Sequence, residues 1–333
     1  MTSPTSAGEM PVQDAGADAG AGTGGTGADA GISAGVGAGV GVDAGVGVGA
    51  AAGDEFVVRP ATLEEWREVA QWAADESWNP GLVDTDCFHA TDPDGFFVGL
   101  LDGRLVSSVS VVNYSAAYAF LGYYLVHPDF RGRGLGLATW RAAMPHAGGR
   151  TVGLDAVPAQ EATYRRSGFR TAYRTTRYRG RPVRSGTASV PVVPMGAGHL
   201  DEVAAFDRQC FPADRRGFLS RWLTAAGHHA YVQVRDGRVA GYGVIRPGRE
   251  GWRVGPLFAD TSRGAAALFD ALVAHPGPDD VVYVDVPDPH HSARSMVLGR
   301  GMVADSHTMR MYTGVVPSVR WEWGYAVTSL ELG

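Results

Sequence analysis

The sequence is constrained most by a pattern of two short apolar runs around an Asp-Gly pair, which occurs twice. In the first copy, residues 96–101 and 104–112 flank Asp102-Gly103. Asp-Gly is a dipeptide that strongly favours a tight turn between antiparallel strands. In the second copy, about 130 residues later, residues 232–235 and 238–245 flank Asp236-Gly237. The repeat predicts two similar domains, each built around a β-hairpin.

The segments that follow the two hairpins come in the same order. The first copy continues with patterns typical of a strand at 120–126, a helix at 135–144, a strand at 151–157 and a helix at 159–167. The second continues at 254–258, 265–273 and 281–286, and its Arg300-Gly301-Met302 corresponds to Ser167-Gly168-Phe169. We therefore expect an α+β fold, with a mixed, mostly antiparallel sheet and flanking helices, as two tandem domains over residues 54–180 and 187–333. Two unrelated α+β domains that each contain a hairpin are the alternative.

Residues 1–53 differ from the rest of the chain because Gly, Ala, Val and Asp dominate them. Dense glycine makes ordering costly, and the small side chains bury too little apolar area to offset that cost. No Lys or Arg precedes Arg59, so the basic start of a secretory signal is missing. We expect a disordered tail, with an adhesive Gly/Ala segment as the alternative. Residues 56–60 then predict the first strand, and residues 62–65 have the capping-box form that opens a helix.

The composition narrows the classes of partner. The 333 residues carry a formal net charge of −6, which argues against the broad basic surface that nucleic-acid binding requires. No apolar run approaches the roughly 18 residues of a membrane span. The two cysteines, Cys87 and Cys210, have neither metal-ligand nor disulfide spacing. We expect a cytoplasmic protein without a metal, a nucleic-acid partner or a membrane partner, and the oligomeric state stays open.

The segment that carries chemistry is a strand that leads into a glycine-rich helix entrance. The strand part reads Tyr123-Tyr124-Leu125-Val126-His127-Pro128-Asp129-Phe130. It is followed by the helix entrance Arg131-Gly132-Arg133-Gly134-Leu135-Gly136, and the helix continues from Leu137. A helix start has unpaired N–H groups and a positive dipole end, so it suits a phosphate or pyrophosphate. Arg131 and Arg133 would add positive charge. Glycine at 134 and 136 would let the anion approach those N–H groups.

Three phosphate-binding motifs can be compared with this segment. A Walker loop needs Gly-Lys-Ser/Thr, and no Lys follows these glycines. A dinucleotide fingerprint would need glycine in place of Leu137 and a position on the first strand of a parallel unit. The third motif, Arg/Gln-x-x-Gly-x-Gly/Ala, is satisfied by Arg131, Gly134 and Gly136. A glycine-rich loop with surface arginines is the non-functional alternative.

On these residues, the region 56–178 resembles a complete domain of the GNAT (N-acetyltransferase) superfamily, whose coenzyme A signature is that third motif. The chain as a whole also resembles a tandem GNAT group that carries Trp78-Asn79-Pro80-Gly81 in its first domain. The resemblance implies acetyl-CoA as co-substrate, with the thioester and pantetheine arm along the strand edge and the pyrophosphate at the helix entrance. The residues implied in this binding are Tyr124, Leu125, Val126, Arg131, Gly132, Arg133, Gly134, Leu135, Gly136 and Leu137.

The resemblance also implies a general acid, because the family places a Tyr four residues before a Gly-Phe pair. Tyr164 occupies that position ahead of Gly168-Phe169, and a phenol can protonate a departing thiolate. A backbone N–H near Val126 would stabilise the oxyanion. Tyr164 could instead be a core or surface aromatic residue. Asp155 could act as the general base or be a hydrogen-bonded aspartate at the end of a strand, and Gln160 could replace the Asn that the family usually has before the Tyr.

The acceptor is expected to enter near Trp78, Asn79 and Asp84, because aromatic and acidic groups together can hold a protonated amine. A loop with a buried Trp and solvated aspartates is the alternative. Cys87 lacks a paired His and is expected to be a small buried residue. The adjacent His290-His291 pair is expected to be solvated rather than to bind a metal.

The second domain is expected to be degenerate. Its helix entrance, residues 258–265, has one glycine and an added acid, Asp260. The position of the second domain that corresponds to Tyr164 is occupied by Val297. This domain would pack against the first and shape the acceptor pocket. We expect an acyl-CoA-dependent N-acetyltransferase that moves an acetyl group from acetyl-CoA to a primary amine, on a small molecule, by direct attack in a ternary complex. A protein lysine acetyltransferase and a non-catalytic acyl-CoA-binding sensor or interaction module are the alternatives.

Overall fold

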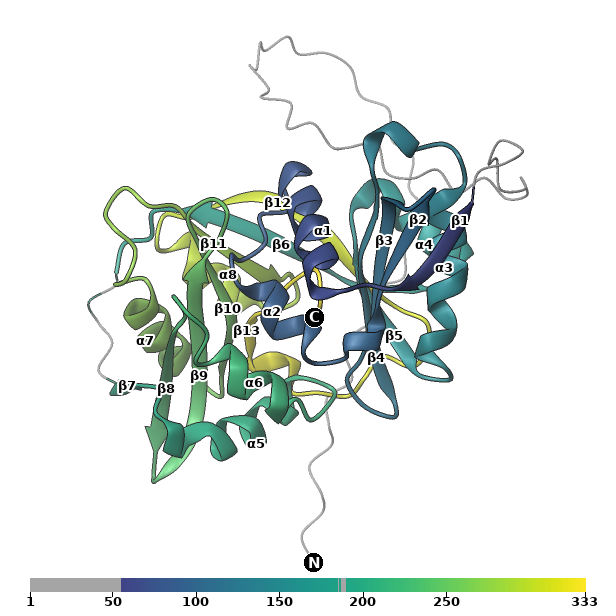
Figure 1. The fold of residues 1–333 in the computed structure, drawn as a ribbon. Coiled ribbons are helices and arrows are strands. Elements are labelled where there is room, and N and C mark those ends of the chain that lie inside the picture. Colours follow the sequence, from purple (N-terminus) through teal and green to yellow (C-terminus); the bar gives the residue numbers. More distant parts are fainter. Residues whose placement is uncertain (1–54, 185, 187–189) are drawn as a thin grey trace, which may run out of the picture.

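The computed structural model describes residues 55–184, 186 and 190–333, so the predicted tail, residues 1–53, lies outside the described residues. Two halves of mixed α/β structure, residues 55–180 and 190–333, share one continuous sheet of 13 strands. Figure 1 shows the strands of the first half on the right, those of the second half on the left, and β6 and β12 between them. The predicted fold, two tandem domains with a mostly antiparallel sheet and flanking helices, is confirmed.

The first half runs in the predicted order. Its helices and strands are β1 Phe56–Pro60, α1 Leu63–Asp75, α2 Asp84–His89, β2 Phe96–Leu101, β3 Arg104–Asn113, β4 Tyr118–Val126, α3 Leu135–Ala143, β5 Thr151–Ala156, α4 Glu161–Arg166 and β6 Arg170–Gly180. Thr62 and Glu65 form the expected capping box at the start of α1. The α4 helix begins later than predicted because Pro158–Gln160 form a 3-10 turn before it.

The second half repeats much of this order. Its elements are β7 Val192–Pro194, α5 Leu200–Cys210, α6 Arg216–Trp222, β8 His229–Arg235, β9 Arg238–Pro247, β10 Trp252–Ala259, α7 Ser262–Leu272, β11 Val282–Pro287, α8 His291–Leu298, β12 Val303–Tyr312 and β13 Gly324–Ala326. Among the described residues no helix is long and apolar enough to cross a bilayer.

The two hairpins correspond in detail. Asp102 and Gly103 have φ of 49° and 76°, and Asp236 and Gly237 have φ of 52° and 72°. Positive φ at both central residues is the backbone of a two-residue turn that matches the twist of the flanking strands. In each hairpin the register shifts at equivalent positions, between Gly99 and Leu100 and between Gln233 and Val234. The shared irregularity supports a common origin of the two halves.

The order of strands in the sheet shows that the halves exchange their sixth strands. The order is β1-β2-β3-β4-β5-β12-β6-β11-β10-β9-β8-β7. β12 pairs antiparallel with β5 of the first half, and β6 pairs antiparallel with β11 of the second. β6 and β12 also pair with each other at the centre. The sheet therefore has no break at the sequence boundary near residue 180.

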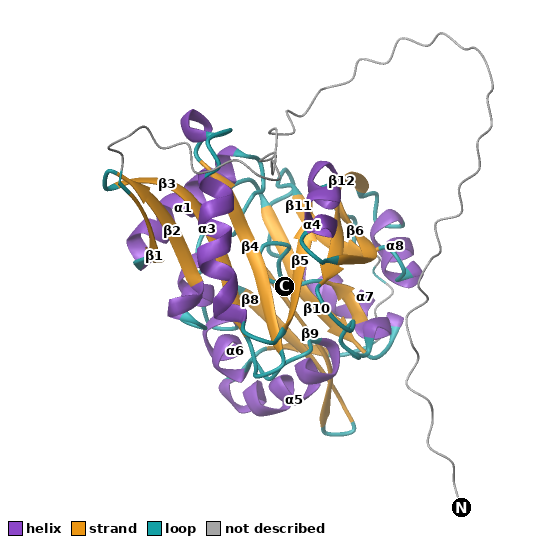
Figure 2. Cartoon of the chain, turned by 90° about the vertical axis from the view of Figure 1, so that its right-hand side faces the viewer, coloured by secondary structure: helices purple, strands orange, loops and turns teal. Residues whose placement is uncertain are grey.

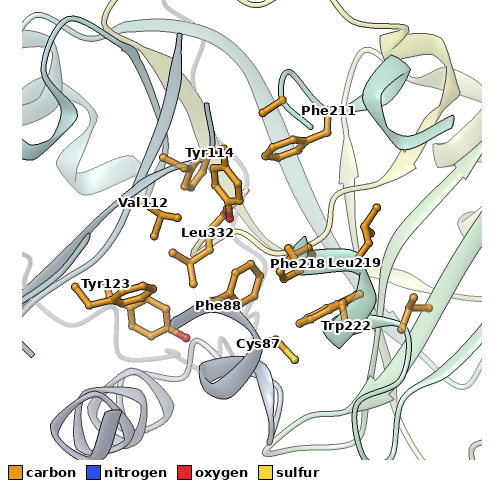
Figure 3. Close-up of a cluster of buried hydrophobic side chains, with 14 of the residues drawn as sticks. Cys87, Phe88, Val112, Tyr114, Tyr123, Phe211, Phe218, Leu219, Trp222 and Leu332 are labelled. Carbon is orange, nitrogen blue, oxygen red and sulfur yellow. The ribbon is translucent and has the colours of Figure 1, made fainter. Parts of the chain in front are cut away.

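A shared hydrophobic core joins the halves on one face of the sheet. Phe88 of α2 stacks on Phe218 of α6 with ring centroids 4.8 Å apart and lies 5.2 Å from Trp222 (Figure 3). The opposite face of the first half is covered by α3, which lies across β2, β3 and β4 (Figure 2). The two faces of β4 thus meet different surroundings: the shared core on one side and α3 on the other.

Candidate active site

A wedge opens between β4 and β5 in the middle of the first half. The two strands pair in parallel only from Tyr118 to Phe120 and from Thr151 to Gly153, and then separate. β4 continues to Val126 with its other edge still paired to β3. Tyr123 has φ of 47°, and the register of β3 and β4 shifts between Ser108 and Ser110, which marks a β-bulge. The edge of β4 over residues 121–126 therefore faces the wedge and is not paired with β5.

The wedge holds a cavity of about 320 Å³ whose walls come from both halves. Residues of the first half line most of it: Glu76, Ser77, Trp78, Leu121, Gly122, Tyr123, Tyr124, Leu125, Val126, Arg131, Leu154, Asp155, Val157, Gln160, Tyr164 and Arg177. The second half adds Asp305, Ser306, His307 and Thr308 of the exchanged β12, and Leu330 and Glu331 near the chain end. Sequence reasoning missed these contributions because no local signal indicates that β12 and the last residues reach the first half.

The α3 entrance lies beyond the end of β4 and is open on its outer side. Gly132 and Gly134 have φ of 76° and 77°, a left-handed backbone that favours glycine. A Cβ at either position would have no described atom within 4 Å. Among the described residues, Gly134 stands at the N-cap of α3 and offers no side-chain cap to its first turn, which begins at Leu135. The first N–H groups of this helix are thus available to an anion.

The charge of Arg131 is not directed to this entrance. Its Nε donates to the Val126 carbonyl at 3.0 Å, and its guanidinium pairs with Glu76. The assignment of Arg131 to a phosphate stays a prediction, and the structure shows its guanidinium already paired with a carboxylate. Its side chain instead ties the end of β4 to the segment that follows α1.

Two tyrosines lie on the α3 side of the wedge. Tyr124 and Tyr164 both pack around Trp140, with ring centroids 5.2 Å and 5.8 Å from it. Burial raises the pKa of Tyr164 above its usual value, and the nearby Tyr124 adds to the rise. A phenol is protonated at neutral pH even at its usual pKa, so the rise does not change the protonation state of Tyr164. The buried hydroxyl of Tyr124 has no hydrogen-bond partner among the described residues.

Asp155 reaches the cavity wall, but its carboxylate is already bonded. Its two oxygens accept from Nε and a terminal nitrogen of Arg310 at 3.0 and 2.6 Å, and its side chain has no exposed surface. Burial raises the pKa of this carboxyl, while the guanidinium opposes the rise. Since both oxygens are occupied, the structure favours the alternative of a hydrogen-bonded aspartate over the general base.

Of the three candidate acceptor residues, the structure brings only Trp78 to the cavity. Asn79 exchanges two hydrogen bonds of 2.9 Å with the backbone of Glu250. Asp84 is buried, and its carboxylate binds the guanidinium of Arg246 at 2.8 and 3.0 Å. The structure therefore favours a structural role for Asn79 and Asp84 over contact with the acceptor. They fasten the first half to the second and so position Trp78.

The remaining candidates have structural roles. Burial raises the pKa of the Cys87 thiol to about 11, which keeps it protonated and unreactive. His290 caps α8 through Nδ1, which accepts from the Ala293 N–H, and its Nε2 lies 2.8 Å from the Glu322 carbonyl. Neither nitrogen is left for a metal. Across the part of the chain that the structure describes, no group of three or more His, Cys, Asp or Glu side chains could hold a metal ion.

The corresponding wedge of the second half is filled by the chain itself. β10 and β11 pair in parallel only from Trp252 to Val254 and from Val282 to Val284. Beyond that point β13 pairs with β10, and the Val327 N–H donates to the Asp285 carbonyl of β11 at 3.1 Å. The α7 entrance differs from that of α3 because the Thr261 hydroxyl caps it by accepting from the Gly264 N–H.

Comparison with known proteins agrees with this geometry. Residues 63–169 match a family model described as the acetyltransferase (GNAT) family, and residues 203–326 match one described as an acetyltransferase (GNAT) domain. Holothin acyltransferase from Pseudoalteromonas sp. (strain SANK 73390) is 37% identical over 275 residues, which cover 83% of this chain and 94% of that protein. The chain belongs to the GNAT acetyltransferase family. It is therefore an acyltransferase of a family that uses acyl-CoA donors.

Solved structures show the same fold at lower identity. A protein from Pyrococcus horikoshii assigned to the acetyltransferases superposes with a TM-score of 0.70 at 20% identity, over 84% of this chain and 96% of that one. A tandem GNAT protein from the clavulanic acid biosynthesis pathway superposes with a TM-score of 0.55 at 17% identity, over 79% of this chain and 100% of that one. The tandem fold of this GNAT protein thus has a solved structural counterpart.

Proposed function

We propose that the first half of this GNAT protein binds acetyl-CoA and transfers the acetyl group to a primary amine of a small molecule, by direct attack in a ternary complex. The observation that carries the proposal is the wedge between β4 and β5, which opens beside an uncapped helix start. A strand edge without a partner offers N–H and C=O groups that amide groups can pair with. The second wedge lacks this edge because β13 occupies it.

The donor would be held by the residues that the sequence motif indicates. Tyr124, Leu125 and Val126 offer the strand edge for the pantetheine amides and the thioester. The pyrophosphate would lie at the α3 entrance, on N–H groups of residues 132–137. Arg133 lies 5.6 Å over the Phe130 ring beside this entrance and would add charge there.

The chemistry needs an electrophile, a stabilised oxyanion and a protonated leaving group. The amine nitrogen attacks the thioester carbon, and a backbone N–H near Val126 stabilises the oxyanion. The C–S bond then breaks, and the Tyr164 hydroxyl gives its proton to the departing thiolate. The place of Tyr164 in the wall of the cavity, beside the strand edge of β4, supports this role.

A small-molecule acceptor is favoured by the shape of the site and by the similarity to Holothin acyltransferase. The cavity of about 320 Å³ is walled by both halves and by the chain end, which leaves limited space for a protein loop. The relative is named for holothin, and its sequence aligns with most of this chain. We therefore place holothin in the first panel of candidate acceptors, together with other small primary amines and a lysine peptide.

The test is thiol release from acetyl-CoA by the full chain across this panel, with mass spectrometry of the products. Tyr164→Phe should lower kcat by about 100-fold or more, the contribution of a positioned general acid. Tyr231→Phe is a matched control, because the Tyr231 hydroxyl contacts His275 on the surface of the second half. Acetylation of the lysine peptide alone would indicate a protein acceptor, and coenzyme binding without turnover of any amine would indicate a sensor.

A further inference from the structure

The C-terminal segment, residues 324–333, connects the two wedges. It starts as β13 in the wedge of the second half and ends against β4 of the first half, where Figure 1 marks the chain end between the halves. The Tyr114 hydroxyl donates to the Leu332 carbonyl at 2.7 Å, and Leu332 lies in the shared core (Figure 3). A Cβ built on Gly122 would lie 1.7 Å from the Glu331 carbonyl oxygen. The segment is thus fixed against β4, next to the bulge at Tyr123.

This contact is on the face of β4 opposite Tyr164. Tyr118, Phe120 and Tyr123 belong to the shared core, whereas Leu121 belongs to the core under α3, against which Tyr124 and Tyr164 pack. Gly122 alternates with Leu121 and therefore faces the shared core. Residues from both faces line one cavity, so the wedge passes through the sheet. A donor beside Tyr164 and an acceptor beside Glu331 could meet in it.

Glu331 differs from the other carboxylates that line the cavity. Glu76, Asp155 and Asp305 each pair closely with an arginine of their own. Glu331 is 3.5 Å from Arg253, which makes shorter bonds of 2.9 Å to Asp285 and 2.7 Å to the Asn79 carbonyl. The Ser329 hydroxyl donates to the other Glu331 oxygen. The carboxylate is therefore held in position, and its contact to an arginine is longer than those of the other three.

We propose that Glu331 is the catalytic carboxylate on the acceptor side, which binds the acceptor's amino group and takes the proton that its nitrogen loses. This inference rests on the proposed acetyl transfer. The N–C bond forms first and gives the oxyanion, and the C–S bond then breaks. One proton passes from nitrogen to Glu331, and one passes from Tyr164 to sulfur. The products are an amide and free coenzyme A, and the net transfer of one proton from carboxylic acid to phenolate restores both groups. A buried carboxylate in a fixed position suits this role because it needs little reorganisation.

The experiment compares Glu331→Gln with the full-length wild type, using the panel amine that wild type turns over fastest. Gln keeps the size and an acceptor for Ser329 but cannot take a proton. We expect kcat to fall about 100-fold and the acid limb of the kcat–pH profile to disappear, while the Kd of acetyl-CoA changes less than twofold. Glu322→Gln removes an exposed carboxylate from the turn just before the segment and should leave both quantities unchanged.

The proposal is overturned if Glu331→Gln keeps the acid limb, or if His307→Gln, on the cavity rim, abolishes it instead. Should the Gln variant not fold, Glu331→Asp carries the test. The shorter carboxylate must keep the acid limb and raise the KM of the amine, and an unchanged KM would overturn the proposal. If wild type acetylates no amine in the panel, the proposed function has failed, whereas turnover that is insensitive to Glu331 rejects only this inference.

Discussion

The α3 entrance allows a sharp prediction through Gly134. An Asp at this position has room, because a Cβ there would contact nothing within 4 Å. The left-handed backbone at Gly134, with φ of 77°, would cost about 1 kcal/mol of stability for a side chain with a Cβ. Asp and Asn tolerate that backbone better than most residues and also cap helices well. The fold should therefore survive the change.

The effect on coenzyme binding comes from charge. A carboxylate about 6 Å from one phosphate charge interacts at about 3 kcal/mol for an effective dielectric constant of about 20. Salt screening at about 0.15 M, with a Debye length of about 8 Å, halves this to about 1.4 kcal/mol, which corresponds to a roughly 10-fold rise in Kd.

The assay is isothermal titration of the full chain with acetyl-CoA, comparing Gly134→Asp with Gly134→Asn. The two side chains have the same shape and differ in charge, so backbone strain cancels in the comparison. We expect the Asp variant to bind about 10-fold more weakly than the Asn variant and the gap to shrink as salt rises. Equal Kd values would refute the assignment of the pyrophosphate to this entrance.

Three further predictions follow from other parts of the fold. Titration should find one acetyl-CoA per chain, because β13 fills the second wedge, and two equivalents would contradict that. Gly122→Ala would place a methyl group on the Glu331 carbonyl, so urea unfolding should show a loss of about 1–3 kcal/mol and amine turnover should fall. Burial raises the pKa of Asp285, but the charges of Arg177 and Arg253 outweigh burial and lower this pKa to about 2. The ionised carboxylate therefore stabilises the fold above about pH 4, and this stabilisation is lost as the pH falls. Asp285→Asn should cost about 3–5 kcal/mol at pH 7 in urea unfolding, and the gap to wild type should narrow by about 2 kcal/mol between pH 5 and pH 2.

Local sequence signals predicted the elements that depend on local chemistry. The Asp-Gly turns gave both hairpins because few dipeptides accept positive φ at both central positions. The Arg131 to Gly136 pattern predicted a glycine-rich helix start, and α3 begins at Leu135 directly after Gly134. Val297 at the position that corresponds to Tyr164 and the loss of glycines predicted a degenerate second half, which stays a prediction. The structure shows that β13 pairs with β10 in the second wedge.

The exchange of β6 and β12 had no such signal. An antiparallel strand can pair with β5 or with β11 when the two halves are alike, and the hydrophobic pattern is the same in both cases. The cavity residues of β12 and of the chain end were therefore missed. For the same reason Asp84 and Asp155 looked available as polar residues near a site, whereas each binds an arginine from the other half, Arg246 or Arg310.

The central claim is that the first half transfers the acetyl group of acetyl-CoA to a small amine, with Tyr164 as the acid. It is tested most directly by supplying trideuteroacetyl-CoA to wild type and to Tyr164→Phe with the amine panel and following products by mass spectrometry. We predict that one amine gains the labelled acetyl group at the rate of thiol release. The variant should bind the coenzyme with unchanged Kd and form the labelled amide at least about 100-fold more slowly. Thiol release without a labelled amide, or equal rates for the two proteins, would contradict the account.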